Sequence, residues 1–114
     1  MGDCKPLFPG TCSRILYCDD NMAVMETELK KDSTIPAHRH DSTQLTIVLK
    51  GSIILGVEGR GEQRLEAGSL LVIEPGRLHW GRALEDSLVI DVNAPLTSDR
   101  REIAEKLGAS CGGS

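Results

Sequence analysis

The sequence has few aromatic residues and lacks a long apolar segment. Its 114 residues include one tryptophan, one tyrosine and one phenylalanine, so aliphatic side chains must build the hydrophobic core. No run of about 18 consecutive apolar residues is present, which argues against a membrane-spanning helix. Residues 1–10 also lack the apolar run of a secretory signal. We therefore expect a cytoplasmic protein that has no membrane partner.

The sequence also lacks a basic segment. The formal net charge is -4, and basic residues are scattered or interleaved with acidic ones. A surface that binds nucleic acid needs a basic patch. We therefore expect no nucleic-acid partner.

The four cysteines include no Cys-x-x-Cys pair. They are Cys4, Cys12, Cys18 and Cys111. Their spacing argues against a zinc knuckle or a thioredoxin motif. We interpret them as ordinary small apolar residues in a reducing compartment, with a disulfide or a redox role as the alternative.

Short apolar runs separated by turn residues recur along the chain. The segment 13–29 favours strands, with a turn at 19–21, and later strands are expected at 44–49, 52–57, 63–65, 69–73, 78–80 and 87–92. We interpret residues 32–36 as a loop. Strands at such spacing, without helices between them, indicate an all-β antiparallel sandwich or barrel.

One short helix is expected near the C-terminus. Asp99 can cap it, Glu102 can complete a capping box, and Gly108 can end it. The predicted organisation is therefore an N-terminal arm (1–12), one barrel with its C-terminal helix (13–107) and a flexible tail (108–114).

The segment 44–49 carries apolar residues at alternating positions of both parities. Leu45, Ile47 and Leu49 would share one face of a strand, and Val48 lies on the other. A strand with two apolar faces needs cover on both sides. This pattern favours a homodimer.

The chain has three histidines, His38, His40 and His79. On a strand, His38 and His40 would project from one face, with Cα atoms about 6 to 7 Å apart. Gln44 has the same parity, so an unbroken strand would turn it to the same wall. Three imidazoles can grip a metal ion and leave positions open for water or substrate.

The first part of this pattern resembles the cupin motif G-x5-H-x-H-x3,4-E-x6-G. Asp32 stands at the leading glycine, and His38, His40 and Gly51 are in register. Gln44 stands where the motif has glutamate.

A second segment resembles the other cupin motif, G-x5-P-x-G-x2-H-x3-N. Gly68, Gly76 and His79 are in register, whereas Glu74 and Ala83 replace the proline and the asparagine. The resemblance implies a jelly-roll cupin barrel, that is, an antiparallel double-stranded β-helix. It also implies one divalent transition metal (zinc, nickel, iron, manganese or copper) held by His38, His40, Gln44 and His79.

The replacement of glutamate by glutamine has a chemical consequence. Gln44 offers a neutral carbonyl oxygen, so a ligand set of three imidazoles and one amide leaves the ion its full positive charge. That charge favours polarisation of a carbonyl or hydroxyl group over activation of dioxygen.

Asp91 interrupts an apolar strand. A buried acid is costly unless it is paired or used, so Asp91 either lines the barrel as a catalytic acid or base beside the metal, or faces outward. The segment around it resembles the end of the small uronate-ketonising cupins of pectin and alginate breakdown, with Asp91 in register. Asn93 and Thr97 replace a phenylalanine and a carboxylate-binding arginine of that pattern.

We therefore predict a metal-binding cupin that acts as an isomerase, tautomerase or lyase on a small polar carbonyl or sugar-acid substrate. The alternatives are a metal-dependent dioxygenase on the same barrel and a non-enzymatic module that binds a small molecule.

Overall fold

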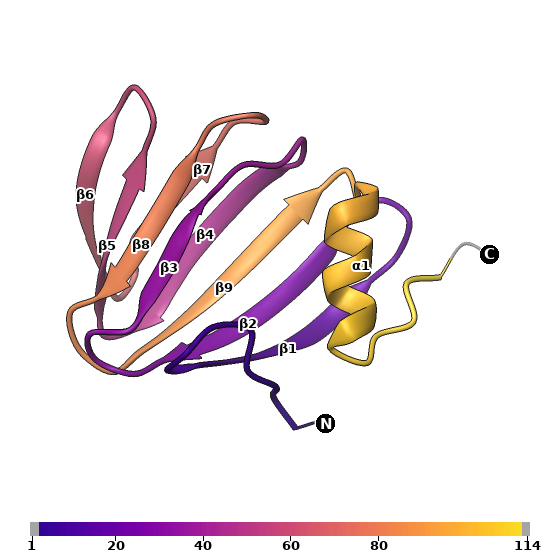
Figure 1. Cartoon of the computed structure of the whole chain (residues 1–114), viewed down its shortest axis with the longest axis horizontal. Coiled ribbons are helices and arrows are strands. Elements are labelled where there is room, and N and C mark those ends of the chain that lie inside the picture. The colour runs from indigo at the N-terminus through magenta and orange to yellow at the C-terminus, as the bar shows by residue number, and fades with distance from the viewer. Residues whose placement is uncertain (1–2, 113–114) are drawn as a thin grey trace.

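The computed structural model describes residues 3–112, which form nine strands and one helix (Figure 1). The larger sheet contains, in spatial order, β1 (Thr11–Cys18), β2 (Ala23–Leu29), β9 (Ser87–Ala94), β4 (Thr43–Lys50) and β7 (Leu70–Ile73). The smaller sheet contains β3 (Thr34–His38), β8 (His79–Ala83), β5 (Ser52–Val57) and β6 (Gly61–Glu66). All pairings are antiparallel. The prediction of an all-β antiparallel barrel with one short C-terminal helix is confirmed.

An aliphatic core joins the two sheets. Val48 of β4, Val57 of β5 and Ile73 of β7 are completely buried, and they belong to one cluster that draws on both sheets. Alternation along β4 turns Gln44, Thr46 and Val48 inward. The same strands therefore carry both the core and the polar interior of the barrel.

The outer face of the larger sheet is also apolar. Leu45 and Ile47 of β4 lie beside Val72 and Leu70 of β7 on this face, and Leu70 is 59% exposed. The two-faced apolar pattern of residues 44–49 is thus real, because one face fills the core and the other lies uncovered on the surface of the chain.

The interpretation of residues 32–36 as a loop is wrong in part, because β3 begins at Thr34. Pro36 lies within this strand. Proline lacks an amide hydrogen but is tolerated in an edge strand, and β3 is an edge of its sheet. Ile35 supplies a reason for the strand, since its side chain packs against the core.

The helix α1 (Ser98–Lys106) begins differently from the prediction. Its N-cap is Thr97, in extended conformation, and Asp99 is the second residue of the helix. The hydroxyl of Thr97 contacts the Asp99 carboxylate, and an acid in the first turn favours the helix dipole. The end is as predicted: Gly108 has φ +92 and its amide donates to the carbonyl of Glu105.

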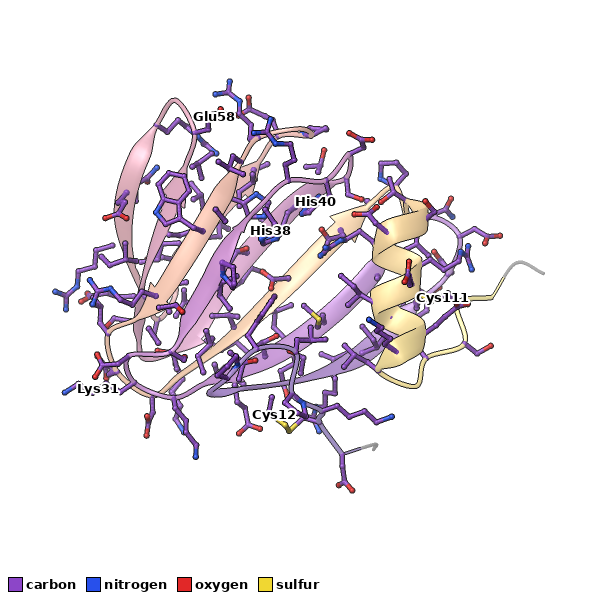
Figure 2. The ribbon with its side chains drawn as sticks, viewed as in Figure 1. Cys12, Lys31, His38, His40, Glu58 and Cys111 are labelled. Atoms are coloured by element: carbon purple, nitrogen blue, oxygen red, sulfur yellow. A yellow bond between two sulfur atoms is a disulfide. The ribbon has the colours of Figure 1, made fainter. Side chains whose placement is uncertain are left out.

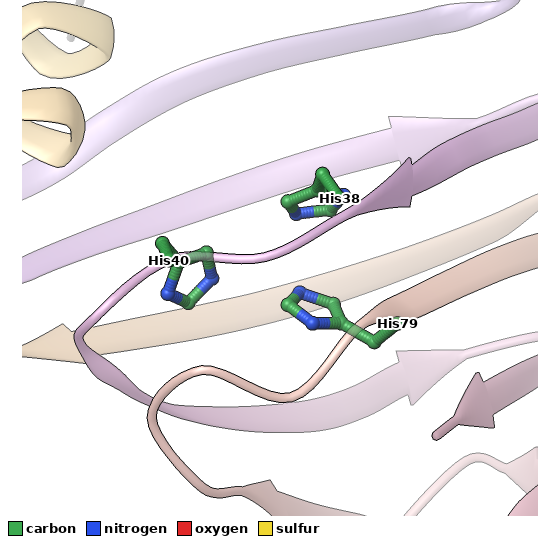
Figure 3. A group of neighbouring side chains, drawn as sticks. All are labelled: His38, His40 and His79. Atoms are coloured by element: carbon green, nitrogen blue, oxygen red, sulfur yellow. The ribbon is translucent and has the colours of Figure 1, made fainter.

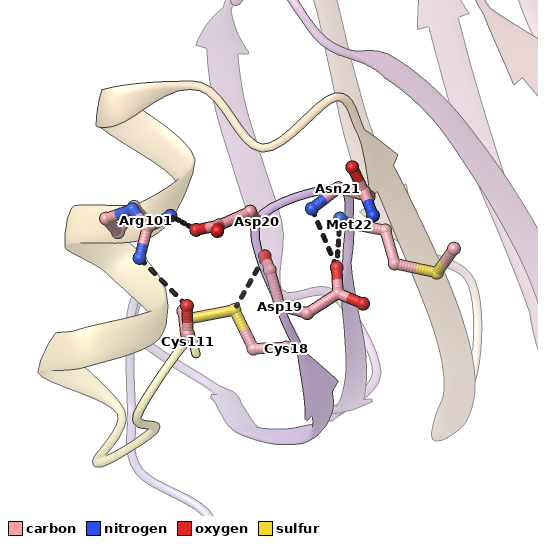
Figure 4. A network of polar contacts seen from close by, with 7 residues as sticks. All are labelled: Cys18, Asp19, Asp20, Asn21, Met22, Arg101 and Cys111. Carbon is pink, nitrogen blue, oxygen red and sulfur yellow. Dashed lines mark hydrogen bonds and ion pairs between the residues drawn. A yellow bond between two sulfur atoms is a disulfide. The ribbon is translucent and has the colours of Figure 1, made fainter. Parts of the chain in front are cut away.

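All four cysteines are paired in disulfides, so their interpretation as free apolar residues is wrong and the alternative holds. Cys4 is bonded to Cys12, and Cys18 is bonded to Cys111. The second pair forms because the chain after α1 returns to the end of β1 (Figure 4), a proximity that cysteine spacing does not reveal.

The segment after α1 is partly anchored. Cys111 is 2% exposed and is bonded to Cys18, whereas residues 113–114 of the predicted tail lie outside the described residues. The division into arm, barrel and tail stays a prediction. In residues 3–112 no helix is long and apolar enough to cross a bilayer.

Candidate metal centre

The three histidines converge between the sheets (Figure 3), and Figure 2 shows His38 and His40 among the side chains of the whole barrel. His38 at the end of β3 is paired in register with His79 at the start of β8, and their ring centroids are 4.2 Å apart. The ring of His40, in the connection to β4, lies 5.7 Å from that of His38 and 5.0 Å from that of His79. One ligand atom from each ring lies within 4.8 Å of the others. These three residues could therefore hold one metal ion.

Hydrogen bonds to the backbone orient all three rings. The Nδ1 atoms of His38, His40 and His79 lie 2.9, 3.2 and 2.9 Å from the carbonyl oxygens of Pro36, Ser42 and Arg77. A carbonyl oxygen only accepts, so Nδ1 of His38 and of His79 carries the proton and Nε2 of each presents a lone pair. This arrangement is typical of histidines that bind a metal through Nε2.

Burial keeps the imidazoles neutral. It lowers the pKa of His38 and of His40, and it lowers the pKa of His79 to about 4. The Nε2 atom of His79 is buried and has no hydrogen-bond partner among the described residues. A buried acceptor without a donor is costly, and a cation would satisfy it.

Gln44 completes the group from the opposite sheet. Its Oε1 atom lies 3.0 Å from Nε2 of His40. Both ring nitrogens of His40 thus face oxygen acceptors, and a neutral ring has one proton, so one of the two contacts joins two acceptors. A metal ion at Nε2 would make that contact favourable. The amide nitrogen donates to Thr46 at 3.0 Å and to Asp91 at 3.3 Å, which turns Oε1 toward the histidines.

The route by which these side chains meet differs from the prediction. His40 lies beyond the end of β3, the register shifts between Ile35 and His38, and Gln44 belongs to β4 of the other sheet. There is no unbroken strand from His38 to Gln44. The chain instead reverses between His40 and Gln44, and the inward face of β4 presents the amide.

Asp91 of β9 lines the interior, not the outer surface. Thr46 donates to its Oδ1 at 2.6 Å. Burial raises the pKa of Asp91 to about 6, although the hydrogen bond from Thr46 and the charge of Arg100 oppose the shift. A carboxyl group that titrates near neutrality beside a metal-ligand cluster can take up or release a proton.

A cavity of about 240 Å³ adjoins the group. Its walls include Asp91, His38 and His79 from the strands, and it is covered by Phe8 of the N-terminal arm and Arg100 of α1. The sequence does not predict that the helix lines the cavity, because acidic and basic residues alternate along it. Arg100 faces the cavity, unlike its neighbour Arg101, because of the way α1 packs against the barrel.

These features are typical of the cupins, a class of small antiparallel barrels whose interior presents a histidine group able to hold a metal. The sequence matches the cupin domain family over residues 25–92, which is more than half of the chain. The protein therefore belongs to the cupin family, as its two motifs predict.

Solved structures share this fold. KdgF from Halomonas sp. has a TM-score of 0.80 at 27% identity, with 86% of this chain and 92% of that chain covered. An RmlC-like cupin from Shewanella frigidimarina has a TM-score of 0.78 at 20% identity, with 84% and 86% covered. DMSP lyase DddQ from Ruegeria pomeroyi has a TM-score of 0.68 at 18% identity, with 74% and 46% covered. No curated protein matches the sequence significantly.

Proposed function

We propose that this cupin binds one divalent transition metal through His38, His40, Gln44 and His79. The observation that carries the proposal is that both ring nitrogens of His40 face an oxygen acceptor, the carbonyl oxygen of Ser42 at 3.2 Å and Oε1 of Gln44 at 3.0 Å, although a neutral imidazole has one proton. The unpartnered Nε2 of His79 supports it. An unmatched pair of acceptors and a buried lone pair are unfavourable without a cation.

We propose further that the site catalyses an isomerase, tautomerase or lyase reaction on a small polar carbonyl or sugar-acid substrate. A divalent ion held by neutral ligands supplies Lewis acidity to a carbonyl or hydroxyl oxygen. Asp91 lies in the same cavity and serves as the acid or base that moves a proton. Thr46, which donates to Asp91, keeps the carboxylate on the cavity side. The resemblance to uronate-ketonising cupins favours a sugar acid.

Elemental analysis of purified protein tests the metal site. We expect about one equivalent of a transition metal in the wild type, its loss in His79→Ala, and reduced content in Gln44→Ala. Gln63→Ala on β6 is the matched control and should retain the metal, because Gln63 does not line the cavity. Equal, low metal content in all four proteins would contradict the proposal.

The competing reaction on this scaffold is oxidation by dioxygen. The neutral amide of Gln44 disfavours it, because three imidazoles and an amide offer no negative charge to a higher-valent ion. An oxygen electrode distinguishes the two: iron-dependent oxygen uptake with turnover would favour a dioxygenase. A small molecule that binds tightly and is never converted would favour a non-enzymatic module.

We also propose that two copies pair through the outer face of the larger sheet. Val92 of β9 and Leu45 of β4 are adjacent on this face, and Ile90 is adjacent to Ile47. Leu70 and Val72 extend the row on β7, and both are exposed. An apolar surface of this kind marks a site of association, and the sheet faces of two copies would cover each other.

The cytoplasmic location stays a prediction, and the disulfides weigh against it. Two disulfides are uncommon in a protein kept in a reducing compartment. Alkylation of thiols in intact cells, followed by mass analysis of the protein, would determine which condition applies.

A further inference from the structure

Helix α1 closes the cavity with a charged residue. Arg100 lies in its first turn and lines the cavity together with Ile103, one turn further on. The side chain of Arg100 is 14% exposed. The cavity wall combines apolar residues such as Met25 and Leu55 with polar residues such as Thr46 and Asn93, and little of the Arg100 side chain reaches solvent.

The guanidinium group of Arg100 makes no close bidentate contact with a carboxylate of residues 3–112, although its charge acts on Asp91 in the same cavity. Its Nε atom is buried and has no hydrogen-bond partner among the described residues. The nearest carboxylate oxygen in an ion pair belongs to Asp99, 3.5 Å from Nε, and the Asp99 side chain is 49% exposed. A buried arginine usually offers its planar set of donors to an anion in a bidentate contact. In residues 3–112 that contact is missing.

The charge of Arg100 reaches the candidate metal centre. After burial, which is the largest cause, its positive charge lowers the pKa of His40, and it also lowers the pKa of His38 and His79. The chain as a whole has a net charge of -4. The cavity presents the cation of Arg100 together with the carboxyl group of Asp91, and a metal ion would add positive charge to it.

A covalent tie keeps this helix in place. Cys111, after α1, is bonded to Cys18 at the end of β1. Arg101, the neighbour of Arg100, donates to the carbonyl oxygen of Cys111 at 3.0 Å and pairs with Asp20 at 2.6 Å (Figure 4). The two adjacent arginines thus differ in their contacts: Arg101 bonds the helix to Cys111 and Asp20, and Arg100 lines the cavity.

We propose that Arg100 is an anion-binding residue of the cavity, which recognises a carboxylate of the ligand, and that the Cys18–Cys111 disulfide holds its guanidinium group in position. The ligand's carboxylate lies on the Arg100 side of the cavity, and its carbonyl or hydroxyl group faces the histidines. A cavity of about 240 Å³ has room for a small organic acid or a sugar acid. This inference rests on the proposed function in one respect: the carboxylate that Arg100 binds belongs to the same ligand whose carbonyl or hydroxyl group faces the histidines.

Binding to metal-free protein tests the inference separately from the metal site. The probe is pyruvate, and its uncharged amide, pyruvamide, is the matched ligand; dissociation constants come from NMR titrations in the presence of a chelator. We expect the wild type to bind pyruvate about tenfold more tightly than pyruvamide, because a charge-assisted bidentate contact contributes about this much. Equal binding of the two probes would overturn the proposal.

Variants assign the preference to one residue. Arg100→Gln should lose the tenfold preference, and Arg100→Lys should keep part of it. Arg64→Gln on β6 is the matched control, because Arg64 is exposed and does not line the cavity; it should leave the preference unchanged. An unchanged preference in Arg100→Gln, or an equal loss in Arg64→Gln, would overturn the assignment.

Two further measurements separate the possible failures. Thermal unfolding confirms that each variant is folded, and metal content should stay at the wild-type value in Arg100→Gln. The disulfide variant Cys18→Ala/Cys111→Ala should bind pyruvate several-fold more weakly, and unchanged affinity would overturn the role of the disulfide. Loss of metal in His79→Ala together with normal pyruvate preference would support this inference and the metal site independently.

Discussion

Removal of the Cys18–Cys111 disulfide should destabilise the protein far more than removal of Cys4–Cys12. The two bonds span 93 and 8 residues of sequence. Closing a loop lowers the entropy of the unfolded chain in proportion to the logarithm of its length, which gives about 4.6 kcal/mol for the long loop and about 2.5 kcal/mol for the short one. The expected difference is therefore about 2 kcal/mol.

Urea denaturation of two double variants measures this difference. Cys18→Ala/Cys111→Ala and Cys4→Ala/Cys12→Ala are compared with the wild type without reductant, and each serves as the control for the other. The change in the free energy of unfolding should be larger for the first variant. Equal losses would refute the loop argument, and four free thiols in denatured wild-type protein would refute the disulfides themselves.

Three other perturbations have defined outcomes. The folded pKa of Asp91, about 6, exceeds its ordinary value of 3.8, so ionisation costs stability as pH rises between these values, up to about 3 kcal/mol above pH 6. Metal-free Asp91→Asn should thus gain stability in urea at about pH 7.5 and none below about pH 3.5; a constant gain would contradict the raised pKa. Gly56→Ala should unfold at lower temperature and shift the Trp80 fluorescence, because an added Cβ would lie 2.1 Å from the indole; an unchanged spectrum would contradict that close approach. Leu70→Lys should halve the mass measured by light scattering, whereas Leu16→Lys on the other edge strand should not; a monomeric wild type would contradict the dimer.

Local patterns in the sequence predicted the histidines and most strands. His38, His40 and His79 follow from motif spacing, and the strand segments follow from short apolar runs between turns. Such signals need no knowledge of distant parts of the chain. They are accurate here because glycines such as Gly51, with φ +81, hold the turns that the spacing implies.

The unpredicted features all depend on contacts between distant segments. Cys18 meets Cys111 across 93 residues, and Arg100 enters the cavity because α1 returns toward the barrel. The sequence predicts Gln44 beside the histidines, but not that it reaches them from the opposite sheet. Spacing along the chain contains no information about these approaches. The sequence does not decide whether Asp91 faces the interior or the outer surface. The register of β9 beside β4 pairs Asp91 with Thr46 and so turns it inward.

Strand β4 encodes two surfaces in alternate residues, and this limits how its sequence can change. Gln44 and Thr46 face the interior, whereas Leu45 and Ile47 face outward. A single inserted or deleted residue would exchange these faces and disrupt the interior and the exterior together. Evolution of this segment is thus confined to substitutions. The outward positions can be changed to adjust association between copies while the inward positions stay untouched, so oligomeric state and chemistry can diverge separately within one strand.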